Sequence, residues 1–122
     1  MVGEMTEIAS DGCAGCDVRD VAFAHVQAIK VQEAANKRFI IAHSSPKWSE
    51  YAAPIIEKYV PMGWPITQTH AAEDPSKKTT VFNTTASREV LGVQYRDFTT
   101  TMIEMAEAMV RLGTIKKPEA AA

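Results

Sequence analysis

The segment DVRDVAFAHVQAIK, residues 17–30, decides the fold that the sequence predicts. Its apolar residues recur with helical spacing, and Asp17 or Asp20 is placed to cap the first N–H groups of a helix. Phe23, Ala24 and Val26 make a second side apolar, and a helix that is apolar on several sides is usually buried between layers. The predicted buried stripe consists of Val18, Val21, Ala22, His25 and Ile29.

Two short segments beyond this helix have the pattern of β-strands. Residues 38–42 (RFIIA) are mostly apolar, as in an inner strand, and residues 66–70 (ITQTH) alternate like an edge strand. Cys16 and Asp17 are placed to end a strand before the first helix. A helix followed by a strand is half of a β-α-β unit, so the sequence predicts an α/β fold.

Three further helices are predicted. One starts at Ser49 and runs from about residue 50 to residue 60, with Pro54 inside it. A short one is capped by Asn83 or Thr84 and ends at Gly92. The last follows Asp97 and ends at residue 113. Residues 71–78 are predicted to form a polar loop, and the buried stripe of the last helix is Phe98, Met102, Met105, Met109 and Leu112.

Composition narrows the class of protein. The chain has 122 residues, enough for one small domain, with 46% apolar residues and a net charge of −2. This charge gives no reason to expect nucleic acid or an anionic membrane as a partner. No run of 18 apolar residues exists to span a bilayer. The acidic start, with Glu4 and Glu7, is unlike a signal peptide, so we expect a cytoplasmic location.

Cys13 and Cys16 form a C-x-x-C motif with three interpretations. A zinc site needs four ligands, and His25, His43 or His70 would have to complete it at unusual spacings. A redox pair usually lies at the start of a helix after a clear strand. Two ordinary reduced cysteines, with Cys16 buried at a strand end, are the preferred interpretation, so we predict no metal site.

Neither the glycines nor His25 indicates a functional site. The glycines at positions 12 and 15 only superficially resemble a dinucleotide fingerprint, because Val18 replaces the third glycine and no apolar strand precedes them. A single histidine on a buried stripe is usually a hydrogen-bonded core residue. His25 is therefore predicted to be structural.

Residues 17–29 resemble the DVRDVA-x-AH segment of dihydroflavonol reductase-like and cinnamoyl-CoA reductase-like enzymes, which are extended short-chain dehydrogenases of the NAD-dependent epimerase/dehydratase superfamily. Residues 33–41 resemble the turn and strand that follow in the family. Residues 82–93 and 111–115 resemble its later helices. The resemblance covers residues 1–117, and residues 118–122 are predicted to be a flexible tail.

This resemblance implies the C-terminal, substrate-side portion of a Rossmann-type fold that lacks the N-terminal dinucleotide-binding half. The family's NAD(P) cofactor donates hydride to a carbonyl while the tyrosine of a Tyr-x-x-x-Lys pair donates a proton. Neither that pair nor the glycine fingerprint occurs here. We therefore assign no catalytic or cofactor-binding residue, and we expect the chain alone to bind no cofactor.

Trp48, Trp64 and Arg19 are the candidate substrate-pocket residues, together with the loop before Asp17. Arg19 would either contact a substrate phosphate or form a structural pair with Asp20 or another acid. The function implied is a fragment of an NAD(P)H-dependent reductase of small-molecule ketones or aldehydes, inactive alone. The alternatives are a sugar-nucleotide epimerase or dehydratase fragment, and a non-catalytic remnant that binds a protein partner or itself through an exposed apolar face.

Overall fold

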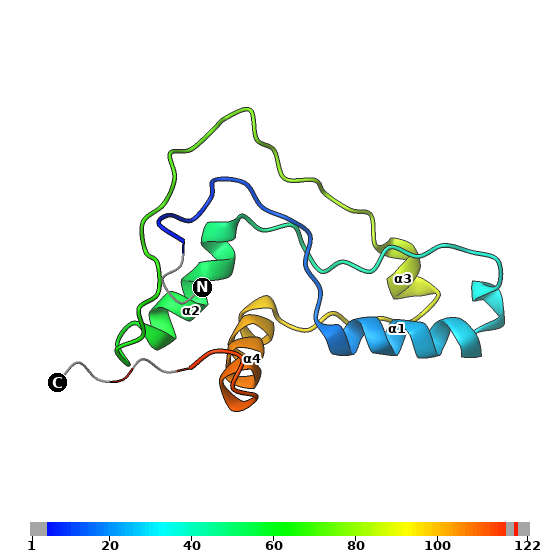
Figure 1. The fold of residues 1–122 in the computed structure, drawn as a ribbon. Helices are drawn as coiled ribbons and strands as arrows, with labels where there is room; N and C mark the ends of the chain where they lie inside the picture. The colour runs from blue at the N-terminus through cyan, green and yellow to red at the C-terminus, as the bar shows by residue number, and fades with distance from the viewer. Residues whose placement is uncertain (1–4, 117–118, 120–122) are drawn as a thin grey trace.

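The computed structural model describes residues 5–116 and residue 119. The described residues form helices α1 (Val18–Lys30), α2 (Trp48–Tyr59), α3 (Thr85–Glu89) and α4 (Phe98–Arg111), with a 3-10 turn η1 (Gln32–Ala34) after α1. Helices α2 and α4 lie at one end of the molecule, and α1 and α3 lie at the other (Figure 1). Long extended segments connect the two ends. The predicted tail, residues 118–122, lies outside the described residues except for Glu119.

Helix α1 forms where the sequence predicted it, but its predicted burial is wrong. Asp17 caps it, because Asp17 Oδ1 accepts a hydrogen bond of 2.8 Å from the Arg19 backbone N–H. The predicted buried stripe faces solvent: Val18 is 77% exposed and Ile29 is 88% exposed. The buried residues of α1 are Asp20 and Ala24. The described residues cover only one side of the helix, and the apolar stripe lies on the other side.

Helix α2 begins at Trp48, two residues before the predicted range. Its first turn is held by Glu50 Oε2, which accepts a hydrogen bond of 2.8 Å from the Lys47 backbone N–H. The helix continues through Pro54 to Tyr59. Its buried face, which packs against α4, consists of Tyr51, Ala52, Ile55 and Tyr59.

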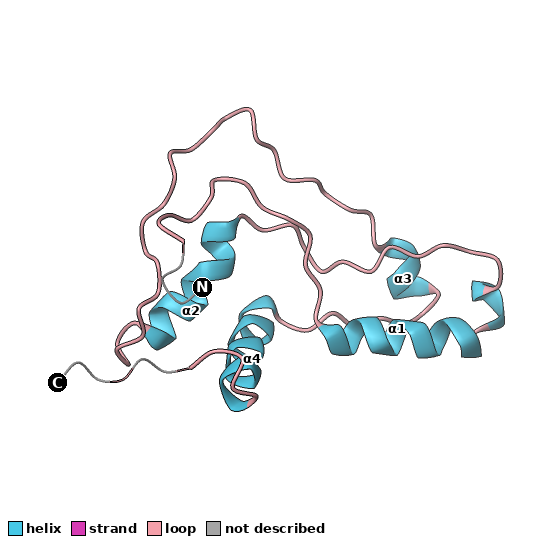
Figure 2. Ribbon diagram, viewed as in Figure 1, coloured by secondary structure: helices cyan, strands magenta, loops and turns pink. Residues whose placement is uncertain are grey.

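Both predicted strands are wrong for the described residues. Residues 38–42 and 66–70 belong to no strand and are drawn as loop in Figure 2. The β pairing in the described residues is limited to three isolated bridges, which join Ile8 to His70, Gly12 to Lys47 and Gly15 to Ser44. A strand requires backbone hydrogen bonds to at least one neighbouring strand, and residues 38–42 have no such partner among the described residues. Their side-chain pattern still resembles that of a strand, with Ile40 48% exposed.

The two later helices have the predicted ends. Asn83 Oδ1 accepts a hydrogen bond of 3.0 Å from the Thr85 N–H at the start of α3. Gly92 follows this helix with φ of +67°, a conformation that glycine adopts without strain. Asp97 caps α4 by accepting a hydrogen bond of 2.8 Å from the Thr100 N–H.

The predicted stripe of α4 is only partly correct. Met102 is 5% exposed, as predicted, but Met105 is 42% exposed and Leu112 is 76% exposed. The second fully buried residue of the helix is Ala106. As in α1, the described part of the chain covers a narrower face than the apolar pattern of the sequence indicates.

Each end of the molecule is held together by its own small hydrophobic cluster. The first joins α2 to α4 and consists of Tyr51, Ile55, Tyr59, Trp64, Met102 and Ala106. The second joins α1 and η1 to the residues after α3 and consists of Ala24, Ala34, Leu91 and Val93. No helix in the described part of the chain is long and apolar enough to cross a membrane.

Ser87 provides a test of the second cluster, because its side chain is fully buried. Its hydroxyl donates a hydrogen bond of 2.8 Å to the Thr84 carbonyl and lies 2.8 Å from Tyr95 Oη. We expect Ser87→Ala to lower the free energy of unfolding by about 1–2 kcal/mol, because the partly buried Thr84 carbonyl and Tyr95 hydroxyl both lose a partner. Urea denaturation measures this loss. Ser76→Ala, at an exposed hydroxyl, is the control, and an equal loss there would contradict the prediction.

Candidate ligand cavity

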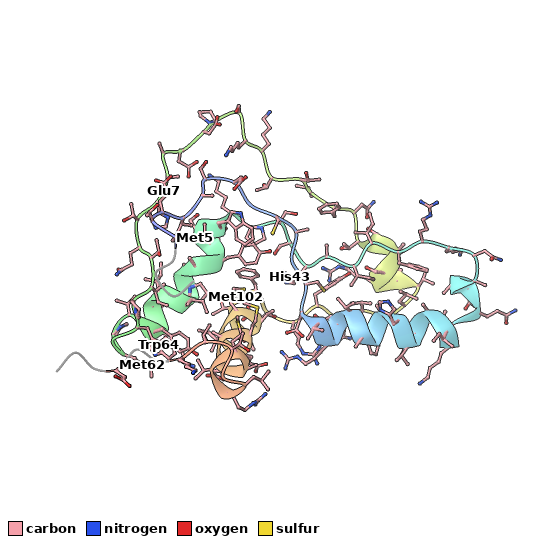
Figure 3. The ribbon with its side chains drawn as sticks, in the orientation of Figure 1. Met5, Glu7, His43, Met62, Trp64 and Met102 are labelled. Atoms are coloured by element: carbon pink, nitrogen blue, oxygen red, sulfur yellow. The ribbon has the colours of Figure 1, made fainter. Side chains whose placement is uncertain are left out.

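A cavity of about 560 Å³ lies between α2, α4 and the N-terminal segment and is the candidate site. Among its lining residues, Figure 3 labels Met5 from the N-terminal segment, Met102 from α4 and His43 from the segment before α2. Further lining residues come from the segment before α1, from the segment before α2, from residues 66–67 and from the segment before α4: Cys13, Gly15, Cys16, Asp17, His43, Ile66, Thr67 and Arg96. The side chains that form most of its wall are apolar or aromatic: Met5, Ile8, Trp48, Tyr51, Ile66, Phe98, Met102 and Met105.

Polar groups gather at the end of the cavity where α1 and α4 begin. Arg96 lies there because its backbone N–H donates a hydrogen bond of 2.8 Å to Asp20 Oδ2, and its guanidinium pairs with the same carboxylate. Asp20 is 2% exposed. The cavity therefore has one guanidinium in its wall, held by a buried acid of α1.

His43 lies beside Tyr95 and Asp97, the two residues that flank Arg96 in the sequence. Its ring meets the Tyr95 ring edge-on, with 6.1 Å between centroids. The Thr100 N–H lowers the pKa of Asp97 from its ordinary value, and His43 adds a smaller contribution in the same direction. Ser44 Oγ holds His43 Nδ1 at 3.0 Å. These contacts place the imidazole against residues 95–97.

Asp17 is the second buried acid at this end, with 4% exposure. It accepts hydrogen bonds from the Arg19 guanidinium at 2.7 and 2.9 Å and from Thr101 Oγ1 at 3.0 Å. The hydrogen bonds from Arg19 hold the pKa of Asp17 well below its ordinary value. Each buried acid is thus matched by an arginine, and this end of the cavity contains two ion pairs.

The wall opposite α4 is fixed by a contact between Tyr51 and the loop before α1. Tyr51 Oη donates a hydrogen bond of 2.9 Å to the Cys13 carbonyl, and burial raises the pKa of Tyr51 to about 12. Gly15 is required beside it, because a Cβ at that position would lie 2.2 Å from Tyr51 Oη.

The two cysteines line the cavity as free thiols. Cys13 is exposed, and Cys16 is partly buried. Burial raises the pKa of the Cys16 thiol, and the charges of Asp20 and Asp17 raise it further. A reactive redox thiol needs a lowered pKa, so the environment of Cys16 does not favour the redox interpretation. In residues 5–116 and 119, no group of three or more His, Cys, Asp or Glu side chains is placed to hold a metal ion.

The structure does not bring the three predicted pocket residues together. Trp48 lines the cavity and packs on Tyr51, with 5.2 Å between ring centroids. Trp64 is 6% exposed and lies in the core against Tyr59, away from the cavity lining. Figure 3 shows it at the other end of α2 from Met5.

Arg19 and His25 both have structural partners. Arg19 pairs with Asp17 and, at 2.6 Å, with Glu104 of α4, so its partners are acids other than Asp20. The prediction that His25 is buried is wrong, because it is exposed; its Nδ1 lies 2.8 Å from the Val21 carbonyl oxygen. The structure therefore makes Arg19 a link between α1 and α4.

His43, Tyr51 and Arg96 are cavity residues that the sequence did not indicate. Each lies in a segment without a recognisable motif, and the partners of Arg96 and Tyr51 are 76 and 38 residues away in sequence. The only available signal was the pair of acids in the DVRD segment, because two acids at the start of a buried helix need cationic partners.

The low pKa of Asp17 predicts a pH dependence. Its pKa in the unfolded chain is about 3.9. Because folding lowers this pKa, its stabilising contribution is present above about pH 4 and is lost as pH falls further. We expect Asp17→Asn to flatten the decline of the unfolding free energy between about pH 5 and pH 2. Urea unfolding at several pH values measures this, and Glu57→Gln, on the exposed face of α2, should keep the wild-type slope. An unchanged slope for Asp17→Asn would contradict the prediction.

Comparisons with known proteins find similarity among solved structures. No family model matches the chain. No curated protein matches it. The structure of Gre2 from Candida albicans matches with a TM-score of 0.72 and 20% identity, over 92% of this chain and 35% of that one. The yeast methylglyoxal/isovaleraldehyde reductase Gre2 complexed with NADPH matches with a TM-score of 0.69 and 18% identity, over 94% of this chain and 38% of that one.

A second structure from Candida albicans, Gre2 in complex with NADPH, matches with a TM-score of 0.68 and 22% identity, over 90% of this chain and 34% of that one. The chain spans little more than a third of the length of these proteins. At these identities the likeness concerns the fold. This chain therefore has the fold of about one third of a Gre2-type reductase.

Proposed function

We propose that this chain is the C-terminal, substrate-side part of an NAD(P)H-dependent carbonyl reductase of the extended short-chain dehydrogenase type. The observation that carries the proposal is the fold match, which takes in 92% of this chain but only 35% of the solved structure. The DVRDVA segment favours a relative of the dihydroflavonol and cinnamoyl-CoA reductases. The cavity beside Trp48 and Arg96 would lie on the substrate side, and its substrates would be small ketones or aldehydes in the cytoplasm.

Two features of the structure support a missing neighbour. The stripe of α1 that contains Val18 and Ile29 is apolar and exposed. Exposed apolar patches usually mark a contact surface, so this stripe is suited to pack against another part of a protein. Residues 38–42 have a strand pattern, but no strand in the described part of the chain pairs with them. A cofactor-binding part of the enzyme would supply both contacts, and it would also hold the NAD(P), which this chain is not expected to bind alone.

A non-catalytic remnant is the second candidate, because the same exposed stripe of α1 would also serve to bind a protein partner or a second copy. A sugar-nucleotide epimerase or dehydratase fragment is less well supported. Arg19, the residue that would contact a nucleotide phosphate, is already paired with Asp17 and Glu104.

A chimaera tests the reductase proposal. The yeast reductase Gre2 would receive residues 5–116 of this chain in place of its own corresponding segment, and oxidation of NADPH would be followed with isovaleraldehyde. We expect carbonyl-dependent NADPH oxidation, and none from Gre2 that lacks the segment. A chimaera that folds and binds NADPH but reduces neither isovaleraldehyde nor an aromatic ketone would refute the proposal.

The native size of the protein separates the reductase from the remnant. An antibody against residues 80–115 would be used on lysate of the source cells. A single band far above 13.4 kDa is expected for part of a full reductase. A band near 13.4 kDa would favour the remnant. Its binding partner would then be sought by using the chain as bait, with variants in the exposed face of α1 as controls.

A further inference from the structure

We propose that Met5 and Met105 make the cavity an oxidant-sensitive binding site. A hydroperoxide converts their thioethers to sulfoxides, and the cavity then loses most of its affinity for apolar ligands. This inference goes beyond the proposed function and does not rest on it, because it concerns side chains of this chain alone.

Sulfur-containing side chains are concentrated on the cavity. The chain has six methionines and two cysteines, and both cysteines and three of the methionines line it: Cys13, Cys16, Met5, Met102 and Met105. Unbranched methionine side chains fill an irregular apolar wall and adapt to the shape of a ligand. The apolar character of this wall therefore depends in part on groups that an oxidant makes polar.

Exposure separates the three methionines of the wall. Met5 is 60% exposed and Met105 is 42% exposed, whereas Met102 is 5% exposed in the cluster between α2 and α4. An oxidant dissolved in water reaches exposed sulfur first, so Met5 and Met105 should react before Met102. Met62 is 52% exposed and lies outside the cavity lining. Figure 3 shows it at the other end of α2 from Met5, so it serves as the internal control.

The two exposed methionines lie on different walls of the cavity. Met5 belongs to the N-terminal segment, where its carbonyl accepts a hydrogen bond of 2.6 Å from Thr67 Oγ1, and Thr67 also lines the cavity. Met105 belongs to α4, three residues after Met102, and residues at this spacing are neighbours on a helix surface. Oxidation of both therefore places new polar groups on two sides of the space that a ligand occupies.

The reaction is an oxygen transfer that needs no ionised protein group. The sulfur lone pair attacks an oxygen of the hydroperoxide, so that the S–O bond forms and the O–O bond breaks. The proton on the transferred oxygen passes to the leaving oxygen, which departs as water or an alcohol. The raised pKa of Cys16 disfavours a thiol reaction but does not affect this one. The sulfoxide oxygen is a hydrogen-bond acceptor, and an apolar ligand that covers it removes its hydration without replacing it.

Dye binding before and after oxidation tests the proposal. Phenylnaphthylamine, a neutral dye whose fluorescence rises in apolar surroundings, would be titrated with the 122-residue chain before and after hydrogen peroxide. Dithiothreitol would then reverse disulfides and sulfenic acids of the cysteines but not the sulfoxides. We expect binding to weaken about tenfold and to recover after treatment with methionine sulfoxide reductases. Failure of the untreated chain to bind the dye, or unchanged binding when mass spectrometry finds Met5 and Met105 oxidised, would overturn the proposal.

Two alanine substitutions locate the dye. Ala52 is 4% exposed and lines the cavity, whereas Ala53 is the next residue of α2 and is exposed. Ala52→Leu should weaken binding, because the added side chain takes up space in the cavity, and Ala53→Leu should not. Equal binding by both variants would place the dye outside the cavity and contradict the proposal.

Leucine substitutions identify the responsible sulfurs, because leucine is apolar, similar in size to methionine and resistant to peroxide. The double variant Met5→Leu, Met105→Leu should bind the dye and keep its affinity after peroxide, whereas Met62→Leu should lose affinity like the unmodified chain. Circular dichroism checks that peroxide and each substitution leave the helices intact, and loss of the helices in the treated chain would refute the proposal. If the double variant or Ala52→Leu unfolds, the single variants Met5→Leu and Met105→Leu decide. Each should lose less affinity on oxidation than the unmodified chain, and an equal loss in both overturns the assignment.

Discussion

Replacing Asp20 with Asn should destabilise the chain by about 3 kcal/mol. The Asp20 side chain is 2% exposed, and it accepts hydrogen bonds from both the backbone and the guanidinium of Arg96. Breaking a buried ion pair by changing one partner typically costs about 3–5 kcal/mol, because the remaining charge is left without compensation. The lower end applies here because the Arg96 side chain is 43% exposed and keeps some contact with water. Urea denaturation with circular dichroism measures the loss.

Glu104→Gln is the matched control for this prediction. It removes a carboxylate that also pairs with an arginine across α1 and α4, but both side chains of that pair are 46% exposed. Exposed ion pairs contribute less than about 1 kcal/mol. If Asp20→Asn costs no more than Glu104→Gln, the buried pair is not what fixes α1 to the segment before α4.

Replacing Gly12 with Ala should destabilise the chain by about 2–3 kcal/mol, through backbone overlap. A Cβ at this position would lie 2.1 Å from the Pro46 carbonyl oxygen and 2.7 Å from the Lys47 Cα. Since both are backbone atoms, no side-chain rotation relieves the contact, and overpacking of this kind costs about 1–3 kcal/mol. The bridge between Gly12 and Lys47 would open, and with it the hydrogen bond of 2.9 Å from the Trp48 N–H to the Asp11 carbonyl.

Gly63→Ala separates this steric effect from a general cost of replacing glycine. Gly63 has φ of +81°, and a Cβ added there would meet nothing within 4 Å, so its substitution should cost about 1 kcal/mol through backbone conformation alone. Thermal and urea unfolding of both variants provide the comparison. Equal losses would show that residues 12 and 47 separate easily.

Local signals in the sequence were sufficient for the helices. Asp17 and Asp97 were recognisable as N-caps because each precedes an apolar-periodic segment, and Gly92 was recognisable as a helix end. These features depend on neighbours within a few residues. The start of α2 was missed by two residues because Lys47 is not a usual N-cap; Glu50, three residues later, supplies the hydrogen bond instead.

Burial and strand pairing were not predictable, because they depend on segments distant in sequence or outside this chain. The stripe with Val18 and Ile29 has the pattern of a buried face, and residues 38–42 have that of an inner strand. Both patterns require a neighbouring layer that the described residues do not provide. The cavity was partly hidden for a related reason: Trp48 and the loop before Asp17 line it, but Arg96 and His43 reach it through tertiary contacts that the sequence does not indicate.

Arg96 has two roles, because one side chain both lines the cavity and holds the buried acid of α1. A ligand group that hydrogen-bonds to this guanidinium would compete with Asp20 for it, and would thereby weaken the contact that holds α1. If a ligand in the cavity changes the affinity of α1 for a partner surface, thermodynamic reciprocity requires that binding of this surface changes the affinity of the cavity for the ligand by the same factor. We therefore expect a protein surface that covers the outer face of α1 to change the affinity of the cavity for a ligand that contacts Arg96.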